Sequence, residues 1–318
     1  MWLWLLILLG FYFLYRWYRD HQVLQNLTDK YVFITGCDSG FGNQLARQLD
    51  GRGLQVLASC LTQRGAEQLK EATSQKLQTI ILDVGDSQQV TAAANWVKQQ
   101  VGDQGLWGLV NNAGIGIPGA PNEWLTKDDF VKVLDVNLLG MIDVTLCLLP
   151  LIRKAKGRII NVSSIVGRIT FCGGGYCISK YGIEAFSDSL RREMNPFGVK
   201  VIILEPGFFK TELNNLQRMR ATLHNIWRQV PAAVQEIYGQ QYFEDYVKHT
   251  EKTFLMLCNP DLSPVSDHME HALTAVHPNT RYSAGWDAKL FYIPLSYLPT
   301  ALADFLLTWP LPKPAGSR

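Results

Sequence analysis

Tyr176 and Lys180 stand four residues apart in the segment Gly-Gly-Gly-Tyr-Cys-Ile-Ser-Lys, and the serine pair Ser163-Ser164 precedes them. Residues i and i+4 of a helix share a face, so a helix here would bring the lysine ammonium near the phenol. A phenol with its ordinary pKa is a poor base at neutral pH, and a neighbouring cation favours its ionised form. Tyr176 could then exchange a proton with a substrate alcohol whose oxygen a serine hydroxyl holds. The pattern therefore predicts proton transfer at an alcohol.

A glycine-rich segment near the start has the context of a dinucleotide-binding loop. The apolar run 31–35 predicts a strand, Gly36-Cys-Asp-Ser-Gly40-Phe-Gly42 follows at once, and the next residues have helical spacing. Glycines allow a tight turn and a close approach of the backbone to a pyrophosphate, which the helix N-terminus would face. A glycine turn without a ligand is the alternative.

Short apolar runs alternate with helical patterns from about residue 28 onward. Fully apolar short strands between helices predict an α/β fold with a doubly wound parallel sheet covered on both faces. Ligands of such sheets bind at the carboxyl ends of the strands, where the glycine loop and the serine pair fall. The predicted strands are residues 31–35, 54–59, 79–82, 106–110, 157–163 and 199–204, and the predicted helices are residues 41–52, 63–74, 87–101, 127–153 and 176–195.

Further segments complete an ordered set of motifs: Asn-Asn-Ala-Gly at 111–114, Asn137 in a predicted helix, and Pro206-Gly207 after the last predicted strand. Together with the glycine loop, the serine and Tyr-x-x-x-Lys, this set resembles the classical short-chain dehydrogenase/reductase family over residues 28–215. Four segments have sequences similar to those of the microsomal retinol dehydrogenase branch, which also contains 3α- and 17β-hydroxysteroid dehydrogenases. These segments are residues 34–42, 173–180, 184–192 and 281–289. The resemblance implies a Rossmann-type fold and reversible hydride transfer between an alcohol and a nicotinamide.

The resemblance also implies roles for individual residues. Tyr176 is the base, Lys180 lowers its pKa and binds the nicotinamide ribose, and Asn137 holds a water that links the lysine to solvent. Ser164 holds the alcohol oxygen, with Ser163 as the competing choice. No metal is implied. The implied cofactor contacts are Gly36, Asp38, Ser39, Gly40, Phe41, Gly42, Asp83 and Val84 (at the adenine), Asn111, Ala113, Tyr176, Lys180, Pro206, Gly207 and Thr211.

The charges near the glycine loop favour NAD over NADP. Asp38 would repel a 2′-phosphate, and residues 57–62 end the second predicted strand without a basic residue. No acidic residue ends that strand either, so the usual NAD signature is incomplete, and Arg64 is near enough to bind an NADP phosphate. An NADPH-preferring reductase of retinal or ketosteroids is therefore the alternative. A catalytically silent binding protein is the third reading, but Tyr176, Lys180, the serine and Asn137 are all present.

Residues 1–18 predict an uncleaved membrane anchor. Residues 2–15 carry no charge, and the basic residues Arg16 and Arg19 follow. A helix of this length reaches about 27 Å, which is close to the thickness of the endoplasmic reticulum bilayer. The positive-inside rule places the catalytic domain in the cytosol, although the sequon at Asn26 would matter only in the lumen. A buried core helix is the alternative.

The rest of the chain predicts one dehydrogenase domain, residues 28–290, and an apolar tail, residues 291–318. Within the domain, residues 208–260 are rich in aromatic side chains and predict a lid for a lipophilic alcohol, or else ordinary core packing. Pro294, Pro299 and Asp304 make the tail a surface helix on the membrane or at the substrate mouth, or an oligomer contact, rather than a second span.

Composition narrows the function. A net charge of +2 with 18% charged residues and no basic stripe argues against nucleic-acid binding. The six cysteines contain no Cys-x-x-Cys pair and are expected to be reduced thiols. The predicted function is NAD-dependent oxidation of retinol to retinal at the endoplasmic reticulum membrane, with 3α-hydroxysteroids as second substrates.

Overall fold

A single sheet of seven parallel strands forms the centre of the computed structural model, in the order β3-β2-β1-β4-β5-β6-β7. The structure describes residues 2–309 and 311–316; residue 1 of the predicted anchor and residues 310 and 317–318 of the predicted tail lie outside this part. The central strands are buried along almost their whole length, as their apolar sequences require. The strands are β1 (Tyr31–Ile34), β2 (Gln55–Cys60), β3 (Gln78–Ile81), β4 (Gly108–Asn111), β5 (Arg158–Val162), β6 (Lys200–Pro206) and β7 (Arg281–Ala284).

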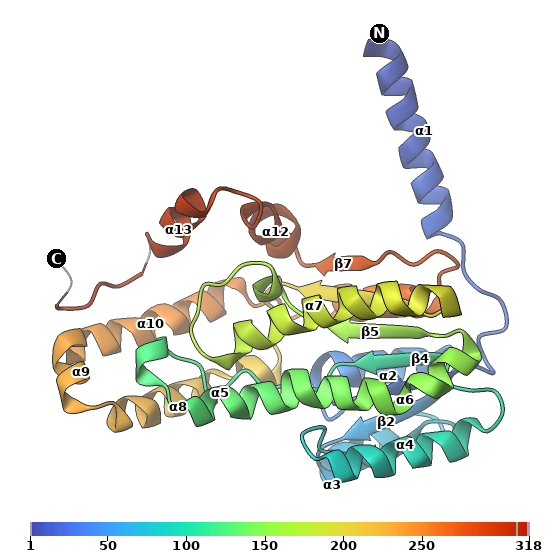
Figure 1. Cartoon of the computed structure of the whole chain (residues 1–318), viewed down its shortest axis with the longest axis horizontal. Coiled ribbons are helices and arrows are strands. Elements are labelled where there is room, and N and C mark those ends of the chain that lie inside the picture. The colour runs from blue at the N-terminus through green and yellow to red at the C-terminus, as the bar shows by residue number, and fades with distance from the viewer. Residues whose placement is uncertain (1, 310, 317–318) are drawn as a thin grey trace.

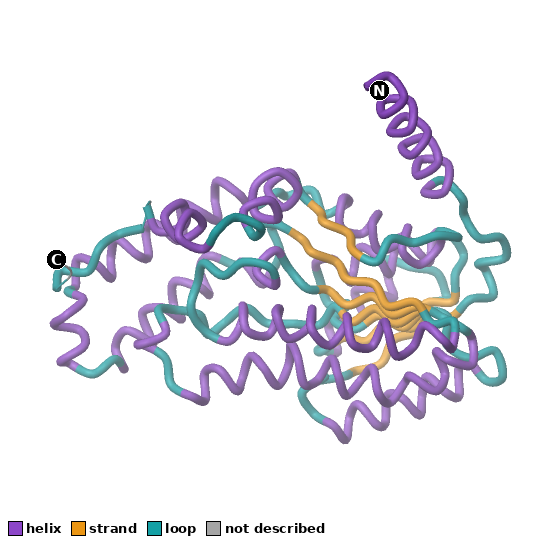
Figure 2. Tube along the Cα trace, turned by 45° about the horizontal axis from the view of Figure 1, so that its top comes forward, coloured by secondary structure: helices purple, strands orange, loops and turns teal. Residues whose placement is uncertain are grey.

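Helices cover both faces of the sheet (Figures 1 and 2). On one face, α2 (Gly40–Gly51), α3 (Gln63–Glu71) and α11 (Ser263–Thr274) bury their apolar sides against the strands. On the other face, α4 (Ser87–Val101), α6 (Met141–Ala155) and α7 (Gly175–Met194) do the same. The predicted α/β fold with a doubly wound sheet is thereby confirmed.

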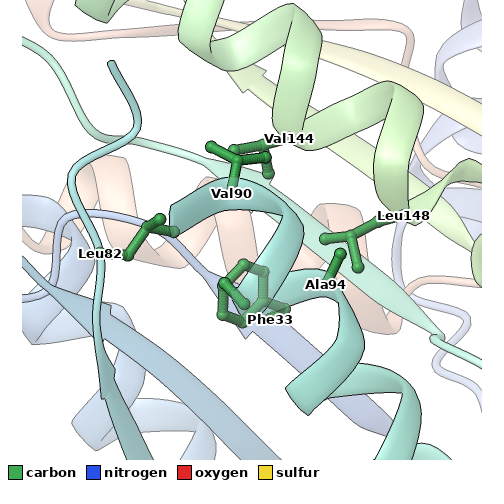
Figure 3. A pocket seen from close by; sticks show the side chains of 7 residues that line it. Phe33, Leu82, Val90, Ala94, Val144 and Leu148 are labelled. Carbon is green, nitrogen blue, oxygen red and sulfur yellow. The ribbon is translucent and has the colours of Figure 1, made fainter. Parts of the chain in front are cut away.

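The layer between the sheet and helices α4 and α6 is tightly packed. Phe33 of β1 lies beneath α4 and α6, where Val90, Ala94, Val144 and Leu148 surround it (Figure 3). The gap that these side chains enclose is too small for a water molecule. This region is core, and the rigid support it gives to β1 fixes the start of the glycine loop.

Two elements differ from the sequence prediction. The predicted helix 127–153 is α5 (Lys127–Leu134) and α6 joined by a π-helical turn, η2 (Asp135–Gly140). The seventh strand, β7, was not predicted, because its inward and outward residues alternate and Arg281 and Ser283 make it look polar. Among the described residues, Lys127–Ala155 is the helix that is long and apolar enough to cross a membrane; α6 packs on the sheet, which explains its apolar sequence.

The remaining segments lie outside this sandwich. Helix α1 (Trp2–Asp20) projects away from the body, and the chain enters the domain where residues 22–24 pair with residues 274–276 (Figure 1). The predicted lid consists of α8 (Leu216–Gln229), α9 (Ala232–Tyr238) and α10 (Gln240–Leu257). The short helices are η1 (Asn122–Trp124), η3 (Ile165–Gly167), η4 (Asn195–Phe197), η5 (Glu212–Asn214), η6 (Ala288–Tyr292), α12 (Ile293–Leu295) and α13 (Thr300–Thr308).

Candidate active site

The predicted site residues gather at the carboxyl ends of the strands. The glycine loop follows β1, Asn111 ends β4, Ser163 and Ser164 follow β5, and Pro206 ends β6. The strand order reverses between β1 and β4, and such a switch point is where ligands bind in open parallel sheets. Helix α7 begins beside the same edge and carries Tyr176 in its first turn.

Tyr176, Ser164 and Lys180 lie close together in the structure. The Ser164 hydroxyl forms a hydrogen bond with the phenol. The Lys180 Nζ lies 5.4 Å from the centroid of the Tyr176 ring and donates a hydrogen bond of 2.8 Å to the carbonyl of Val162 at the end of β5. The helix therefore sets the lysine beside the tyrosine, while the strand holds the ammonium group in place.

Burial dominates the titration of both groups. It raises the pKa of Tyr176 above its ordinary value, and the hydrogen bond from Ser164 acts in the opposite direction. Burial also lowers the pKa of Lys180 to about 8, an effect that the negative charge of Glu184 opposes. A lysine with this pKa is still largely protonated at neutral pH, and its charge favours the phenolate form of its neighbour.

The two candidate serines face different ways. Ser164 turns its hydroxyl toward Tyr176, where it also accepts from the amide of Val166 at 3.3 Å. The Ser163 hydroxyl instead donates to the carbonyl of Lys180 at 3.3 Å and contacts the Glu184 carboxyl. The geometry thus brings the Ser164 hydroxyl to the Tyr176 phenol and places the Ser163 hydroxyl against the main chain of Lys180.

Asn137 lies in the π-helical turn and is 1% exposed. Its side chain pairs with the backbone of Ile115, accepting at 2.8 Å and donating at 2.9 Å, and it donates to the Ser179 hydroxyl at 3.1 Å. Ser179 in turn donates to the carbonyl of Tyr176 at 2.6 Å. Both N–H groups of the Asn137 side chain are thus used inside the protein. A water molecule bound at Asn137 would therefore have to donate a hydrogen bond to an oxygen atom of this residue.

The glycine loop forms a cradle at the start of α2. Gly36 and Gly40 have positive φ angles of 70° and 63°, and a Cβ at Gly36 would lie 2.8 Å from the Ala113 Cα. Ser39 occupies the N-cap position of α2 but makes no capping hydrogen bond with its side chain. The first N–H groups of the helix thus keep their capacity for an anion, which fits the pyrophosphate of a dinucleotide.

Asp38 reaches a place that the sequence did not reveal. Its carboxylate accepts hydrogen bonds from the amides of Leu61 at 2.7 Å and Thr62 at 2.9 Å, and from the Thr62 hydroxyl at 2.7 Å. Those residues immediately follow β2. An acidic group therefore does stand at the end of the second strand, although it comes from the glycine loop.

The other predicted cofactor residues surround the same edge. Asn111 donates to Thr145 and Asn161 at 2.8 Å each, and its buried Oδ1 has no partner within the protein. Thr211 lies opposite Gly40, while Gly207 follows β6 and donates to Ala284 at 2.8 Å. Phe41 packs against the core, Gly42 lies against the Asn112 side chain, and Asp83-Val84 form the turn after β3.

An aromatic cluster packs beside Tyr176. Phe171, Phe208 and Tyr292 pack together with ring centroids 5.2–5.9 Å apart, and Phe254 of α10 contacts Phe208 at 5.8 Å. Tyr292 comes from the C-terminal part of the chain, so the start of the predicted tail lies at the site. Nothing in the local sequence distinguished this tyrosine.

Most of the aromatic lid residues serve another purpose. Trp227 and Phe243 stack with centroids 5.0 Å apart, and Trp124, Tyr238, Tyr242 and Tyr246 gather around them. These side chains form a small core that holds α8, α9 and α10 together. Within the predicted lid, Phe208 belongs to the aromatic cluster beside Tyr176, and Phe254 contacts it.

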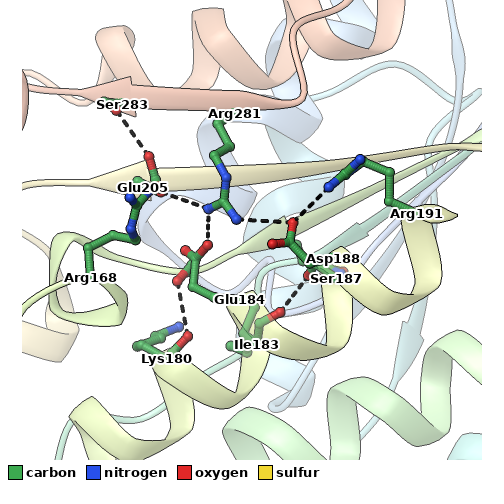
Figure 4. A network of polar contacts seen from close by, with 12 residues as sticks. Arg168, Lys180, Ile183, Glu184, Ser187, Asp188, Arg191, Glu205, Arg281 and Ser283 are labelled. Carbon is green, nitrogen blue, oxygen red and sulfur yellow. Dashed lines mark hydrogen bonds and ion pairs between the residues drawn. The ribbon is translucent and has the colours of Figure 1, made fainter. Parts of the chain in front are cut away.

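A network of charges, in which Glu184 and Glu205 are buried, lies behind Lys180 and was missed by sequence reasoning (Figure 4). Arg281 of β7 forms ion pairs with Glu184 and with Glu205 (2.9 Å), and its other nitrogen binds Asp188 at 3.0 Å. Arg168 binds Glu205 at 3.0 Å. Glu184 lies one helical turn beyond Lys180, so Arg281 fixes the carboxylate that acts on the lysine.

Cys172 and Cys177 flank the tyrosine, with their sulfur atoms 3.2 Å apart. Their mutual hydrogen bond raises the pKa of Cys172 and lowers that of Cys177. Thiolate character at either cysteine would raise the pKa of Tyr176, because both lie close to the phenol.

Comparison with known proteins agrees with this geometry. The profile of the short chain dehydrogenase family matches residues 30–221. Retinol dehydrogenase 16 of Homo sapiens is 60% identical over 315 residues, and 17-beta-hydroxysteroid dehydrogenase type 6 of Homo sapiens is 59% identical over 315 residues; each match covers 99% of both chains. The crystal structure of a short-chain dehydrogenase from Streptomyces avermitilis superposes with a TM-score of 0.68 at 25% identity, covering 88% of this chain and 97% of that one.

Proposed function

The chain belongs to the short-chain dehydrogenase family and is an oxidoreductase that uses a nicotinamide cofactor, and on this premise we propose that it oxidises retinol to retinal with NAD. We further propose 3α-hydroxysteroids as second substrates of the same site. The observation that carries the proposal is the Tyr176–Ser164–Lys180 group, whose tyrosine packs in one apolar cluster with Phe171, Phe208 and Tyr292. The names of the full-length relatives support both substrate classes.

The residues of this chain divide the work at the alcohol. The Ser164 hydroxyl holds the alcohol oxygen, and the Tyr176 phenolate accepts its proton. Lys180 favours the phenolate by its charge, and the carbonyl of Val162 keeps the ammonium group beside the ring. A bound nicotinamide supplies the hydride acceptor. The aromatic side chains exclude water from the reacting carbon and offer an apolar surface for a lipid.

Asp38 supports the preference for NAD. Its carboxylate lies at the end of β2, where a dinucleotide-binding fold places the acid that binds a ribose hydroxyl. A 2′-phosphate at this position would be repelled. The NADPH-dependent reductase remains the second candidate because Arg64 stands exposed in the first turn of α3, beside the residues that Asp38 binds.

We propose that α1 anchors the protein in the endoplasmic reticulum membrane, with the catalytic domain in the cytosol. Many large apolar side chains of this helix are exposed, among them Trp4, Leu8, Phe11 and Trp17. A helix that is apolar on all sides and projects from its domain fits a bilayer better than water (Figure 1). The exposed side chains of α13, such as Phe305, would rest on the membrane surface or contact a second copy of the chain.

Initial rates with each cofactor and a panel of alcohols test the proposal. We expect retinol and a 3α-hydroxysteroid to be oxidised with NAD, and NADP to give a lower kcat/KM because Asp38 repels its phosphate. The Asp38→Asn variant should raise the rate with NADP relative to NAD, and Asp50→Asn, an acid at the far end of α2, is the control. Faster turnover with NADP by the unmodified protein would favour the reductase and implicate Arg64.

A further inference from the structure

A basic cavity lies at the end of the sheet opposite the candidate active site. It has a volume of about 480 Å³ and opens between the last turns of α7 and the amino ends of β6 and β7. Three cations line it, together with polar groups that can donate hydrogen bonds. The lining residues that carry these groups are Arg191, Arg192, Asn195, Lys200, Asn279 and Thr280. The proposed oxidation uses none of them.

The charges around this cavity are predominantly positive. Arg192 is exposed, and Lys200 spends one of its three N–H donors on the carbonyl of Val276 at 2.9 Å. Burial and then the neighbouring charges of Arg158 and Arg19 lower the pKa of Lys200. Asp188 is paired with Arg191, which lines the cavity, and with Arg281. An anion in the cavity would therefore relieve repulsion among cations.

The cavity also lies at the foot of α1. Arg16 of this helix donates to the Asn279 side chain, which lines the cavity, at 3.4 Å. Arg19, in the last turn of α1, is close enough to lower the pKa values of Lys200 and His277. Figure 1 shows the start of β7 beside the lower end of α1. If α1 spans the bilayer, this cavity opens at the level of the lipid head groups.

We propose that the cavity binds the phosphate of an anionic phospholipid from the membrane that holds α1. Guanidinium groups recognise phosphate oxygens through paired N–H donors, and Lys200 adds a point charge. Basic residues next to a membrane span are attracted to the anionic lipids of the cytosolic leaflet. The inference rests on the proposed anchor, because the anchor is what brings head groups to the cavity.

Lipid retention by the full-length protein tests this inference. The protein in nanodiscs of phosphatidylcholine with phosphatidylserine is released into mild detergent, and bound lipids are counted by native mass spectrometry. We expect one phosphatidylserine to be retained by the unmodified protein, and about tenfold weaker retention by Arg192→Gln/Lys200→Gln. The control Lys70→Gln/Lys98→Gln removes two exposed lysines from α3 and α4 and should behave like the unmodified protein.

Separate measurements distinguish failure of the inference from failure of the anchor. Flotation with vesicles of phosphatidylcholine alone reports on α1. A protein that floats but retains no phosphatidylserine, or retains it equally in the double variant, would overturn the head-group site while leaving the anchor intact. Inorganic phosphate that protects the protein against thermal unfolding as strongly as phosphatidylserine does would also overturn the head-group site, since the cavity would then be a site for free phosphate. A protein that does not float with vesicles of any composition would overturn both the anchor and the head-group site.

Discussion

The hydroxyl groups of two adjacent serines, Ser163 and Ser164, have different partners, and this difference favours Ser164 as the proposed substrate contact. Ser164 points to the Tyr176 phenol, whereas Ser163 points to the main chain of Lys180. Both are almost fully buried, so neither exposure nor sequence position separates them. The contact with the phenol is therefore the observation that supports a role for Ser164.

We expect Ser164→Ala to lower kcat/KM by about 10²-fold, because it removes a hydrogen bond to the oxygen that reacts. Ser163→Ala should lower it only a few-fold, because its hydroxyl supports the backbone of α7. Steady-state kinetics with retinol, together with thermal melting of both variants, checks this. A larger loss in the Ser163 variant at equal stability would transfer the role to that serine.

Glu184 is expected to set the pH at which activity is lost on the alkaline side. Its negative charge raises the pKa of Lys180 against the effect of burial, which brings that pKa to about 8. Glu184→Gln removes this charge, so the pKa of the lysine falls further and the ammonium form is lost at lower pH. Because the reaction needs the ammonium form, the alkaline limb of the kcat/KM profile should move to lower pH.

Asp188→Asn is the matched control for this change. Asp188 binds the same Arg281 from the same helix but does not act on Lys180. Its alkaline limb should stay in place. An unchanged profile in a folded Glu184→Gln variant, or a shift to higher pH, would show that the carboxylate does not tune the lysine.

For strands and helices, the sequence predicted what local signals determine and missed contacts between residues that are far apart in the chain. The strands β1 and β5 were placed to within one residue at each end because their apolar runs are local signals. Tyr176 and Lys180 were predicted as site residues from helical spacing and from family resemblance. The contact of Arg281 with Glu184 spans 97 residues, and the reach of Asp38 to Thr62 spans 24. Such pairings depend on how the strands assemble, and local patterns carry no signal of them.

Helix α1 yields the element-scale prediction. Removing residues 1–20 takes away the exposed apolar helix and also the contact of His271 with the Asp20 carbonyl. We expect most of the protein to move from the membrane to the soluble fraction in cell fractionation, with the exposed side chains of α13 retaining a part. A truncated protein that sediments entirely with membranes, while staying folded by circular dichroism, would show that α1 is not the main anchor.

At the scale of the whole molecule, the two ends of the sheet have different chemistry. The carboxyl ends of the strands carry the tyrosine, the glycine cradle and an aromatic cluster to which the lid and the C-terminal segment both contribute. The amino ends of β6 and β7 carry the basic cavity beside α1. The predicted family and enzyme class are confirmed, whereas the membrane face and the preferred cofactor stay predictions. We propose that the protein takes a lipid alcohol at one end of the sheet and contacts the bilayer near the other.

We propose that Tyr176 accepts the proton of a membrane-borne alcohol during its oxidation with NAD. The decisive measurement is the amount of retinal formed from retinol and NAD by the full-length protein and by its Tyr176→Phe variant. We predict steady formation of retinal by the unmodified protein and a loss of at least about 10²-fold in the variant at the same melting temperature. A variant that keeps comparable activity, or an unmodified protein that oxidises small polar alcohols and neither retinol nor a 3α-hydroxysteroid, would contradict the claim.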